Sequence, residues 1–233
     1  MPWLITHRKD VFSQCGDDGV LEIIFDRIGE GKKWCCEFGA WDGIWLSNTY
    51  NRIANYGWSG VLIEPDQEKF LQLKTNMEKF VNVIPVNAAV EATEVANPNF
   101  GANSLDAILG RTPIPRDFDL LSIDVDGPDY WIWKSLENYQ PRVVIIEVTD
   151  HPLGLDARKI YEYGQPGGST ILPMVELAKQ KGYELACVTG NAIFVLRELC
   201  EKLDIDPDNW QKLVIKEVSS DEWRASAPKA GLL

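Results

Sequence analysis

The chain has 233 residues, of which 45% are hydrophobic and 25% are charged. This composition is typical of a globular protein and excludes disorder over most of the chain. The formal net charge of −12 disfavours nucleic acid as a partner, because the phosphate backbone would be repelled. No stretch approaches the ~20 apolar residues of a membrane span, and the N-terminal residues lack the apolar core of a signal peptide. We therefore expect a cytoplasmic protein with a single domain over residues 1–233.

The cysteines are odd in number and show no CxxC spacing, so we expect reduced and mostly buried thiols. They are Cys15, Cys35, Cys36, Cys187 and Cys200. With only two histidines in the sequence, a zinc site of the Cys/His type has few ligands available.

Hydrophobic periodicity predicts strands and helices in alternation, which is typical of a parallel sheet covered by helices. In chain order the predicted elements are a helix at 17–29, a strand at 34–38, a helix at 47–55, a strand at 60–64, a helix at 66–79, a strand at 81–86, a helix at 105–109, a strand at 120–124, a helix at 130–137, a strand at 143–148, a helix at 171–181 and strands at 183–188 and 192–196. The last two strands flank a Thr189-Gly190-Asn191 turn and predict an antiparallel hairpin. The irregular stretch 150–168 suits a substrate loop, and the polar tail from Asp206 onward is expected to fray.

Glycines follow the first predicted strand in the segment Glu37-Phe-Gly-Ala-Trp-Asp-Gly43. Glycine lets the backbone approach a ligand closely, and the N-terminus of the next helix offers free N–H groups to a carboxylate. Glu37, just before the first glycine, suits an ammonium group. A nicotinamide dinucleotide site would need GxGxxG, of which only Gly39 and Gly43 are present. The alternative is that these glycines only form a tight turn.

Glu64 ends the second predicted strand about 20 residues further on, where a carboxylate can accept both hydroxyls of a ribose. Pro65 is expected in the turn that follows, and Asp66 as the cap of the next helix.

Three carboxylates, Asp124, Asp126 and Asp129, follow the fourth strand. Side chains of like charge this close repel one another in apolar surroundings, so their charge must be compensated. The compensation could come from a divalent cation such as Mg²⁺ bound by all three, from the positive charge of a cofactor, or from solvent and helix capping by Asp129.

Glu147 closes the fifth strand, and Asp150 and His151 follow it closely. A base at this edge of the sheet could take the proton from a hydroxyl group, and His151 is the histidine near the expected site. The alternative interpretation of His151 is an exposed loop residue before Pro152. The candidate catalytic residues are therefore Asp124, Asp126, Glu147 and His151.

Several segments, taken in order, carry a family resemblance. They are Cys36-Glu-Phe-Gly-Ala-Trp-Asp-Gly43, Ser47-Asn-Thr49, Gly57-Trp-Ser-Gly-Val-Leu-Ile-Glu-Pro65, Leu121-Ser-Ile-Asp-Val-Asp-Gly127, Pro141-Arg-Val-Val-Ile-Ile-Glu147, Lys181-Gly-Tyr-Glu-Leu185 and Asn191-Ala-Ile-Phe-Val195. The chain resembles the FkbM-type S-adenosylmethionine-dependent methyltransferases in these segments. The resemblance covers about residues 12–197, which we take as the core, with an N-terminal helix and a C-terminal extension appended.

The resemblance implies a Rossmann-like α/β fold of the class I methyltransferases. This fold has a seven-stranded, mostly parallel sheet with an antiparallel C-terminal hairpin, and helices on both faces. S-adenosylmethionine (SAM) would lie over the C-terminal ends of the first strands. By position, Glu37 and the glycine loop would hold its methionine part, Glu64 the ribose, and Asn87 with Ala88 the adenine edge. Asn87 could equally be a turn former.

The cofactor-binding residues expected in this way are Glu37, Gly39, Ala40, Trp41, Asp42, Gly43, Ser47, Asn48, Glu64, Pro65, Asn87, Ala88 and Asp124. We expect SAM-dependent methylation of a hydroxyl group on a small molecule or glycan. Two alternatives stay open: an NAD-dependent oxidoreductase, and a non-catalytic module that binds a cofactor with the same fold. The sequence does not define the acceptor or the oligomeric state, and a homodimer is left open.

Overall fold

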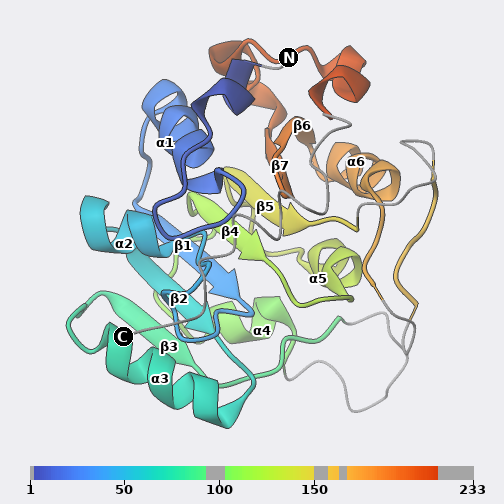
Figure 1. The fold of residues 1–233 in the computed structure, drawn as a ribbon. Helices are drawn as coiled ribbons and strands as arrows, with labels where there is room; N and C mark the ends of the chain where they lie inside the picture. Colours follow the sequence, from blue (N-terminus) through green and yellow to red (C-terminus); the bar gives the residue numbers. More distant parts are fainter. Residues whose placement is uncertain (1–2, 93–102, 150–156, 163–166, 215–233) are drawn as a thin grey trace.

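The computed structural model describes residues 3–92, 103–149, 157–162 and 167–214 (Figure 1). A seven-stranded sheet runs through the middle of this structure in the order β3-β2-β1-β4-β5-β7-β6. The strands are β1 Trp34–Phe38, β2 Ser59–Ile63, β3 Val83–Val86, β4 Leu120–Ile123, β5 Val143–Glu147, β6 Tyr183–Val188 and β7 Asn191–Leu196. Neighbours from β3 to β5 pair in parallel, whereas β7 is antiparallel to both β5 and β6. This confirms the expected Rossmann-like class I methyltransferase fold, including the C-terminal hairpin.

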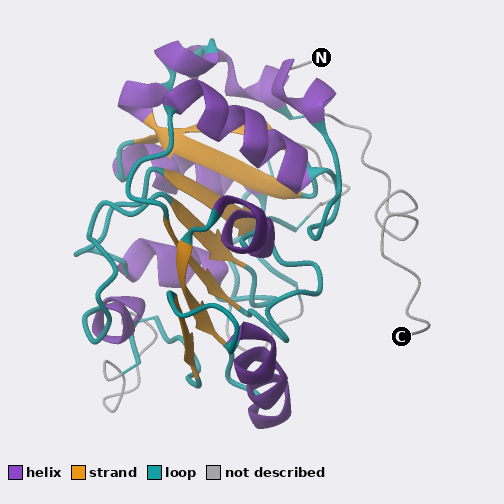
Figure 2. Cartoon of the chain, turned by 90° about the vertical axis from the view of Figure 1, so that its left-hand side faces the viewer, coloured by secondary structure: helices purple, strands orange, loops and turns teal. Residues whose placement is uncertain are grey.

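Helices cover both faces of the sheet (Figure 2). One face carries α1 Asp17–Ile28, α2 Tyr50–Tyr56 and α3 Gln67–Met77, and the other carries α4 Leu105–Leu109, α5 Asp129–Ser135 and α6 Ile171–Gln180. Successive strand residues point to opposite faces, so Cys35 joins the first apolar layer and Cys36 the second. Both strand faces are buried, which explains why the strands read as continuous apolar runs in the sequence.

The register brings the ends of four strands to one edge of the sheet. Phe38, the last residue of β1, is paired with Ile63 of β2 and with Ile123 of β4. Ile123 is in turn paired with Ile146 of β5. The residues that follow these strand ends therefore meet at the same edge, although they are far apart in the sequence.

Most boundaries agree with the sequence prediction to within two residues, and two regions differ by more. Helix α2 begins at Tyr50, three residues later than expected, because the preceding residues form hydrogen bonds with Glu37. We expected the chain from Asp206 to fray, but Pro207–Leu213 forms a 3-10 helix in which Trp210 is buried in the second apolar layer. An indole buried among apolar side chains stabilises this segment despite its polar composition.

Candidate functional site

The Glu37 carboxylate lies inside the loop between β1 and α2. It accepts hydrogen bonds from Ser47 Oγ at 2.6 Å, from the Asn48 backbone N–H at 2.9 Å and from Thr49 Oγ1 at 2.7 Å. Burial raises the pKa of Glu37, and these donors oppose that rise. Glu37 therefore organises the loop, and its expected contact with an ammonium group stays a prediction.

Asn48 links this loop to the neighbouring strand. Its Nδ2 donates to Ser122 Oγ of β4 at 3.1 Å. The side chain is buried, and within the described part of the chain its Oδ1 has no hydrogen-bond donor. Buried acceptors normally have a partner, so this oxygen stands out, and the expected cofactor contact of Asn48 stays a prediction.

Tight contacts fix the loop from Gly39 to Gly43. Gly39 has a φ of 74°, and a Cβ at this position would collide with the backbone carbonyl of Asp124. Only glycine therefore allows β1 and β4 to approach this closely at their ends. The Asp42 carboxylate accepts from the backbone N–H groups of Ile44 and Trp45 at 2.9 and 2.7 Å, so Asp42 serves the loop itself.

Glu64 lies directly after β2 and its side chain is buried. One carboxylate oxygen accepts from the Trp41 backbone N–H at 2.8 Å and the other from the Asp66 N–H at 2.9 Å. Each carboxylate oxygen has a second lone pair that can accept from a hydroxyl group. Asn87 donates through Nδ2 to the carbonyl of Glu64 at 2.8 Å and to that of Pro65 at 3.2 Å. Asn87 therefore ties the turn after β3 to the turn after β2.

A largely apolar cavity of about 190 Å³ lies at these strand ends. It is lined by Phe38, Gly39, Ile63, Pro65, Ala88, Ala89, Val90, Val125 and Pro128. Gly39, Pro65 and Ala88 were expected at the cofactor site. The other lining residues were not. A second cavity of about 170 Å³, lined by residues such as Trp3 and Leu213, contains none of the residues that follow β1, β2, β4 or β5.

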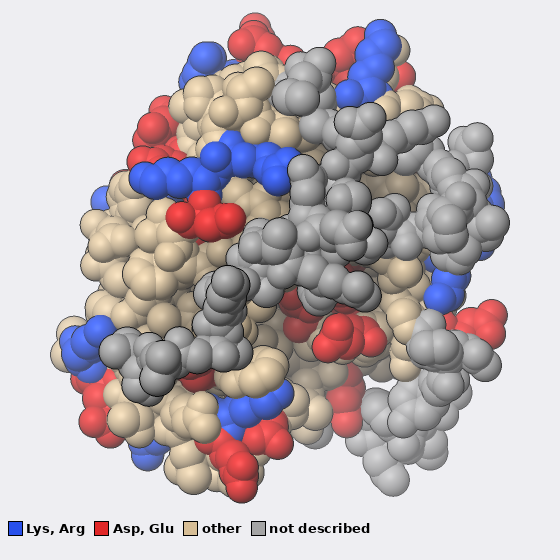
Figure 3. Space-filling view, in the orientation of Figure 1, with Lys and Arg blue, Asp and Glu red and all other residues tan. Residues whose placement is uncertain are grey.

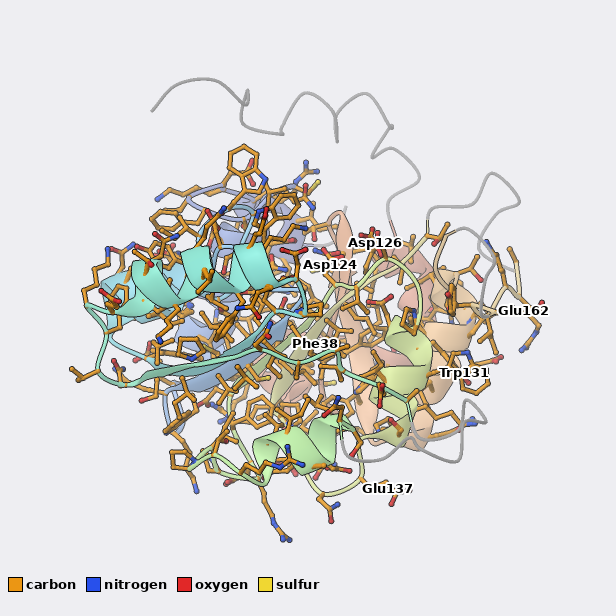
Figure 4. All side chains as sticks on the ribbon, turned by 90° about the horizontal axis from the view of Figure 1, so that it is seen from below. Phe38, Asp124, Asp126, Trp131, Glu137 and Glu162 are labelled. Atoms are coloured by element: carbon orange, nitrogen blue, oxygen red, sulfur yellow. The ribbon has the colours of Figure 1, made fainter. Side chains whose placement is uncertain are left out.

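Carboxylates from two neighbouring strands gather beside the first cavity. Oxygen atoms of Asp124 and Asp126, which follow β4, and of Glu147, which ends β5, lie within 4.8 Å of one another. Figure 4 shows Asp124 and Asp126 side by side, and acidic side chains are visible near the centre of the face in Figure 3. We call these three residues the acidic trio.

Burial and nearby negative charges raise the pKa values of two members of the acidic trio, Asp124 and Glu147. Burial, followed by the charge of Glu147, raises the pKa of Asp124 to about 8. Burial, followed by the charges of Asp129 and Asp126, raises the pKa of Glu147 to about 7. A cation bound here would favour the ionised carboxylates and lower both pKa values.

Asp129 forms hydrogen bonds within the turn that follows β4. Its two carboxylate oxygens accept from the backbone N–H groups of Val125 at 3.0 Å and Gly127 at 2.9 Å, so it closes the turn after β4. The sequence left Asp129 open as a metal ligand with Asp124 and Asp126 or as a capping residue, and its role as a metal ligand stays a prediction. In the structure Glu147 is the third carboxylate, because β5 pairs directly with β4.

His151 lies outside the described residues, as does Asp150. The assignment of His151 as a general base therefore stays a prediction. Among the residues that the structure describes, Glu147 is the strand-end carboxylate whose pKa lies nearest neutrality.

No family model matches the chain, and no curated protein matches it in sequence. Among solved structures, it is similar to a SAM-dependent methyltransferase from Aquifex aeolicus, with 11% identity, a TM-score of 0.43, and coverage of 75% of this chain and 86% of that chain. A SAM-dependent methyltransferase from Clostridium acetobutylicum ATCC 824 has 10% identity, a TM-score of 0.46 and coverage of 80% and 93%. Aeropyrum pernix fibrillarin with bound SAM has 12% identity, a TM-score of 0.47 and coverage of 72% and 67%.

At these identities and TM-scores the similarities add no weight to the assignment of the fold, which depends on the strand order and directions given above. Of the helices within the described residues, none has the length and apolar character needed to cross a membrane.

Proposed function

We propose that this protein is a SAM-dependent methyltransferase that methylates a hydroxyl group on a small molecule or glycan. The observation that carries the proposal is the meeting of three features at one sheet edge: the cavity at the ends of β1 and β2, the buried Glu64 beside it, and the acidic trio. An apolar cavity with a few convergent polar groups is the usual form of a cofactor site.

Each part of SAM has a chemical counterpart at this edge. The apolar cavity suits the adenine ring, and the free lone pairs of Glu64 suit the ribose hydroxyls. The loop from Gly39 to Gly43, with the buried and unpartnered Asn48 Oδ1 behind it, suits the methionine part. The acidic trio suits the positive sulfonium group, which would offset the repulsion among its carboxylates.

When bound, SAM supplies a methyl group on a positively charged sulfur. The protein would hold the acceptor oxygen in line with that methyl group, which supplies rate enhancement through orientation. As the new O–CH₃ bond forms, the acceptor must lose a proton. Glu147 is our candidate for the base among the described residues, because it ends β5 at this sheet edge. Without a cofactor its pKa is raised to about 7, and a bound cation would keep it in the ionised form that accepts a proton.

Mg²⁺ is a second candidate ligand of the acidic trio, because three carboxylate oxygens within 4.8 Å are hard donors of the kind this ion prefers. Asp124, Asp126 and Glu147 would hold it. An NAD-dependent oxidoreductase is the other class we considered, since Glu64 would also suit the ribose of NAD. The absence of GxGxxG after β1 tells against it. A non-catalytic module that only binds the cofactor would bind SAM without turnover.

The test is calorimetry of the full chain with SAM, with its demethylated product S-adenosylhomocysteine (SAH), and with NAD. We expect SAM and SAH to bind and NAD not to bind. Glu64→Ala should weaken binding by about 1–3 kcal/mol, because charged hydrogen bonds to the ribose are lost. Glu68→Ala, which removes an exposed glutamate from α3, is the matched control and should bind normally. Tight NAD binding, or unchanged SAM affinity in folded Glu64→Ala, would contradict the proposal.

A separate assay tests turnover. Incubation with methyl-labelled SAM and a panel of saccharide and lipid-linked glycan acceptors should transfer label to at least one acceptor. Cofactor binding with no transfer to any acceptor of the panel would favour the non-catalytic module.

A further inference from the structure

The turn from Val125 to Pro128 lies between the cavity and the aromatic ring of Tyr161. Val125 and Pro128 line the cavity that we assign to the cofactor, and Gly127 between them contacts the ring of Tyr161. A Cβ at Gly127 would lie 2.8 Å from Tyr161 Cε2 and 3.1 Å from Cζ, both closer than ordinary contact distance. Gly127 does not have the positive φ that would demand glycine. Its lack of a side chain is therefore explained by the aromatic ring that lies against it.

Tyr161 is held in place from two directions. Its backbone N–H donates to Ser169 Oγ at 2.9 Å, just before α6. Its carbonyl accepts from Trp131 Nε1 of α5 at 2.8 Å. Thr170 Oγ1 donates to the Ala157 carbonyl at 2.6 Å and accepts from the Lys159 N–H at 3.0 Å, so the short described segment before Tyr161 is attached as well. The ring thus presses on the turn from a fixed support.

The turn combines a left-handed residue with an internal carboxylate clamp. Asp126 has a φ of 56°, a left-handed conformation that a residue with a side chain adopts at an energetic cost. The Asp129 carboxylate closes the turn from within through the Val125 and Gly127 N–H groups. The contact with Tyr161 on the outer side of the turn therefore sets where the turn lies relative to the cavity. The position of the Asp126 carboxylate depends on the same contact.

We infer that Tyr161 is a positioning residue that holds the Val125–Pro128 turn against the cofactor cavity and thereby sets the affinity for the cofactor. This inference depends on the proposed function, because it takes the cavity as the site of SAM. Tyr161 acts through Gly127, and its flat ring is the part that matters. The phenol hydroxyl has no role in it.

The experiment measures the affinity of the full chain for SAH by calorimetry, and its folding by thermal unfolding. Tyr161→Phe keeps the ring and should change the dissociation constant by less than about twofold. Tyr161→Ala removes the ring that contacts Gly127 and should raise the dissociation constant about three- to tenfold. Gly127→Ala inserts a methyl group between the Tyr161 ring and the turn and should raise the dissociation constant about tenfold or more. If Tyr161→Ala does not fold, Tyr161→Leu, which lacks the flat ring, replaces it.

The double variant Gly127→Ala with Tyr161→Ala gives the sharpest result. The added methyl group then meets empty space, so binding should be no weaker than in Tyr161→Ala alone. If the dissociation constant of the double variant rises by the product of the two single fold-changes, the inference is overturned. Normal SAH binding in folded Gly127→Ala and folded Tyr161→Ala would also overturn it. So would a loss of SAH affinity in Tyr161→Phe equal to that in Tyr161→Ala. If the unmodified protein fails to bind SAH, the proposed function itself is wrong, and the inference is overturned with it.

Discussion

The most quantitative prediction concerns Asp17, a fully buried carboxylate in the first turn of α1. Thr189 Oγ1 forms a hydrogen bond with one of its oxygens, and Asn191 Nδ2 donates to the other at 3.0 Å. Burial raises the pKa of Asp17 from 3.8 to about 7, although both hydrogen bonds oppose the rise. The folded protein therefore favours the neutral acid. A neutral Asp17 can donate to Thr189 Oγ1, whose own proton can go to the Asn191 carbonyl at 3.2 Å.

The sign of the pH effect follows from this pKa. Between the ordinary value and about 7, the folded state binds a proton that the unfolded state has lost, so stability falls as pH rises. The contribution is fully present below pH 3.8 and is lost once the pH exceeds about 7. At about 1.4 kcal/mol per pKa unit, the whole effect is about 4 kcal/mol.

Asp17→Asn should remove this loss, since an amide can accept from Asn191 and donate to Thr189 while staying uncharged. We would measure the free energy of unfolding by urea denaturation at about pH 5.5 and about pH 8.5, above the pI of about 4.7. Between these two pH values, the free energy of unfolding should fall by about 2 kcal/mol more in the unmodified protein than in Asp17→Asn. Other titrating groups contribute equally to both proteins.

Asp18→Asn is the matched control. The Asp18 carboxylate accepts from three successive backbone N–H groups, those of Val11, Phe12 and Ser13, at 2.7–2.9 Å, and also from Ser13 Oγ. An amide accepts these bonds less strongly, so this variant should be less stable by about 1–3 kcal/mol at both pH values. Equal pH slopes for Asp17→Asn and the unmodified protein would refute the reasoning on Asp17.

Four further experiments test the site and its framework. Asp124→Asn keeps the shape of the acidic trio while removing charge, so it should cut methyl transfer at least about a hundredfold with little change in unfolding; full activity in this folded variant would remove Asp124 from the reaction. Activity that is lost in EDTA and restored by Mg²⁺ would add an ion to the site, and full activity in EDTA would leave the trio to the sulfonium group. Glu37→Gln places an amide among three hydrogen-bond donors and should destabilise the protein by about 1–3 kcal/mol in urea denaturation, along with weaker SAM binding; unchanged stability would show that the loop does not depend on this carboxylate. Arg142→Ala leaves the buried Asp119 carboxylate without the guanidinium that lies 2.8 Å from it. The free energy of unfolding should fall by about 3–5 kcal/mol, and a fall of less than about 1 kcal/mol would contradict this prediction.

Features set by local sequence were predictable. The alternation of apolar runs and amphipathic segments placed every described strand within a few residues, because both faces of the strands other than the edge strand β3 are mostly buried. The carboxylate of Asp66 caps α3 by accepting from the N–H groups of Glu68 and Lys69, as a residue of this type before a helix should. The position of Glu64 after β2 was also readable from the spacing alone.

Features set by contacts between distant segments were not predictable. Spacing along the chain suggested that Asp129 would join Asp124 and Asp126, whereas the pairing of β4 with β5 brings in Glu147. Sequence alone does not show whether a carboxylate binds a ligand or accepts hydrogen bonds from nearby backbone N–H groups. Asp129 accepts from the backbone of its own turn. The contact between Gly127 and Tyr161 joins segments 34 positions apart, and no local pattern signals it.

The position of β7 also affects how the protein is made. Among the strands that the structure describes, it is the last to leave the ribosome, yet it lies between β5 and β6. Until residues 191–196 emerge, β5 has an unpaired edge of apolar residues, and such edges recruit other chains. A chain truncated before Asn191 should therefore aggregate during synthesis, even though every strand-end residue of the candidate site precedes the break.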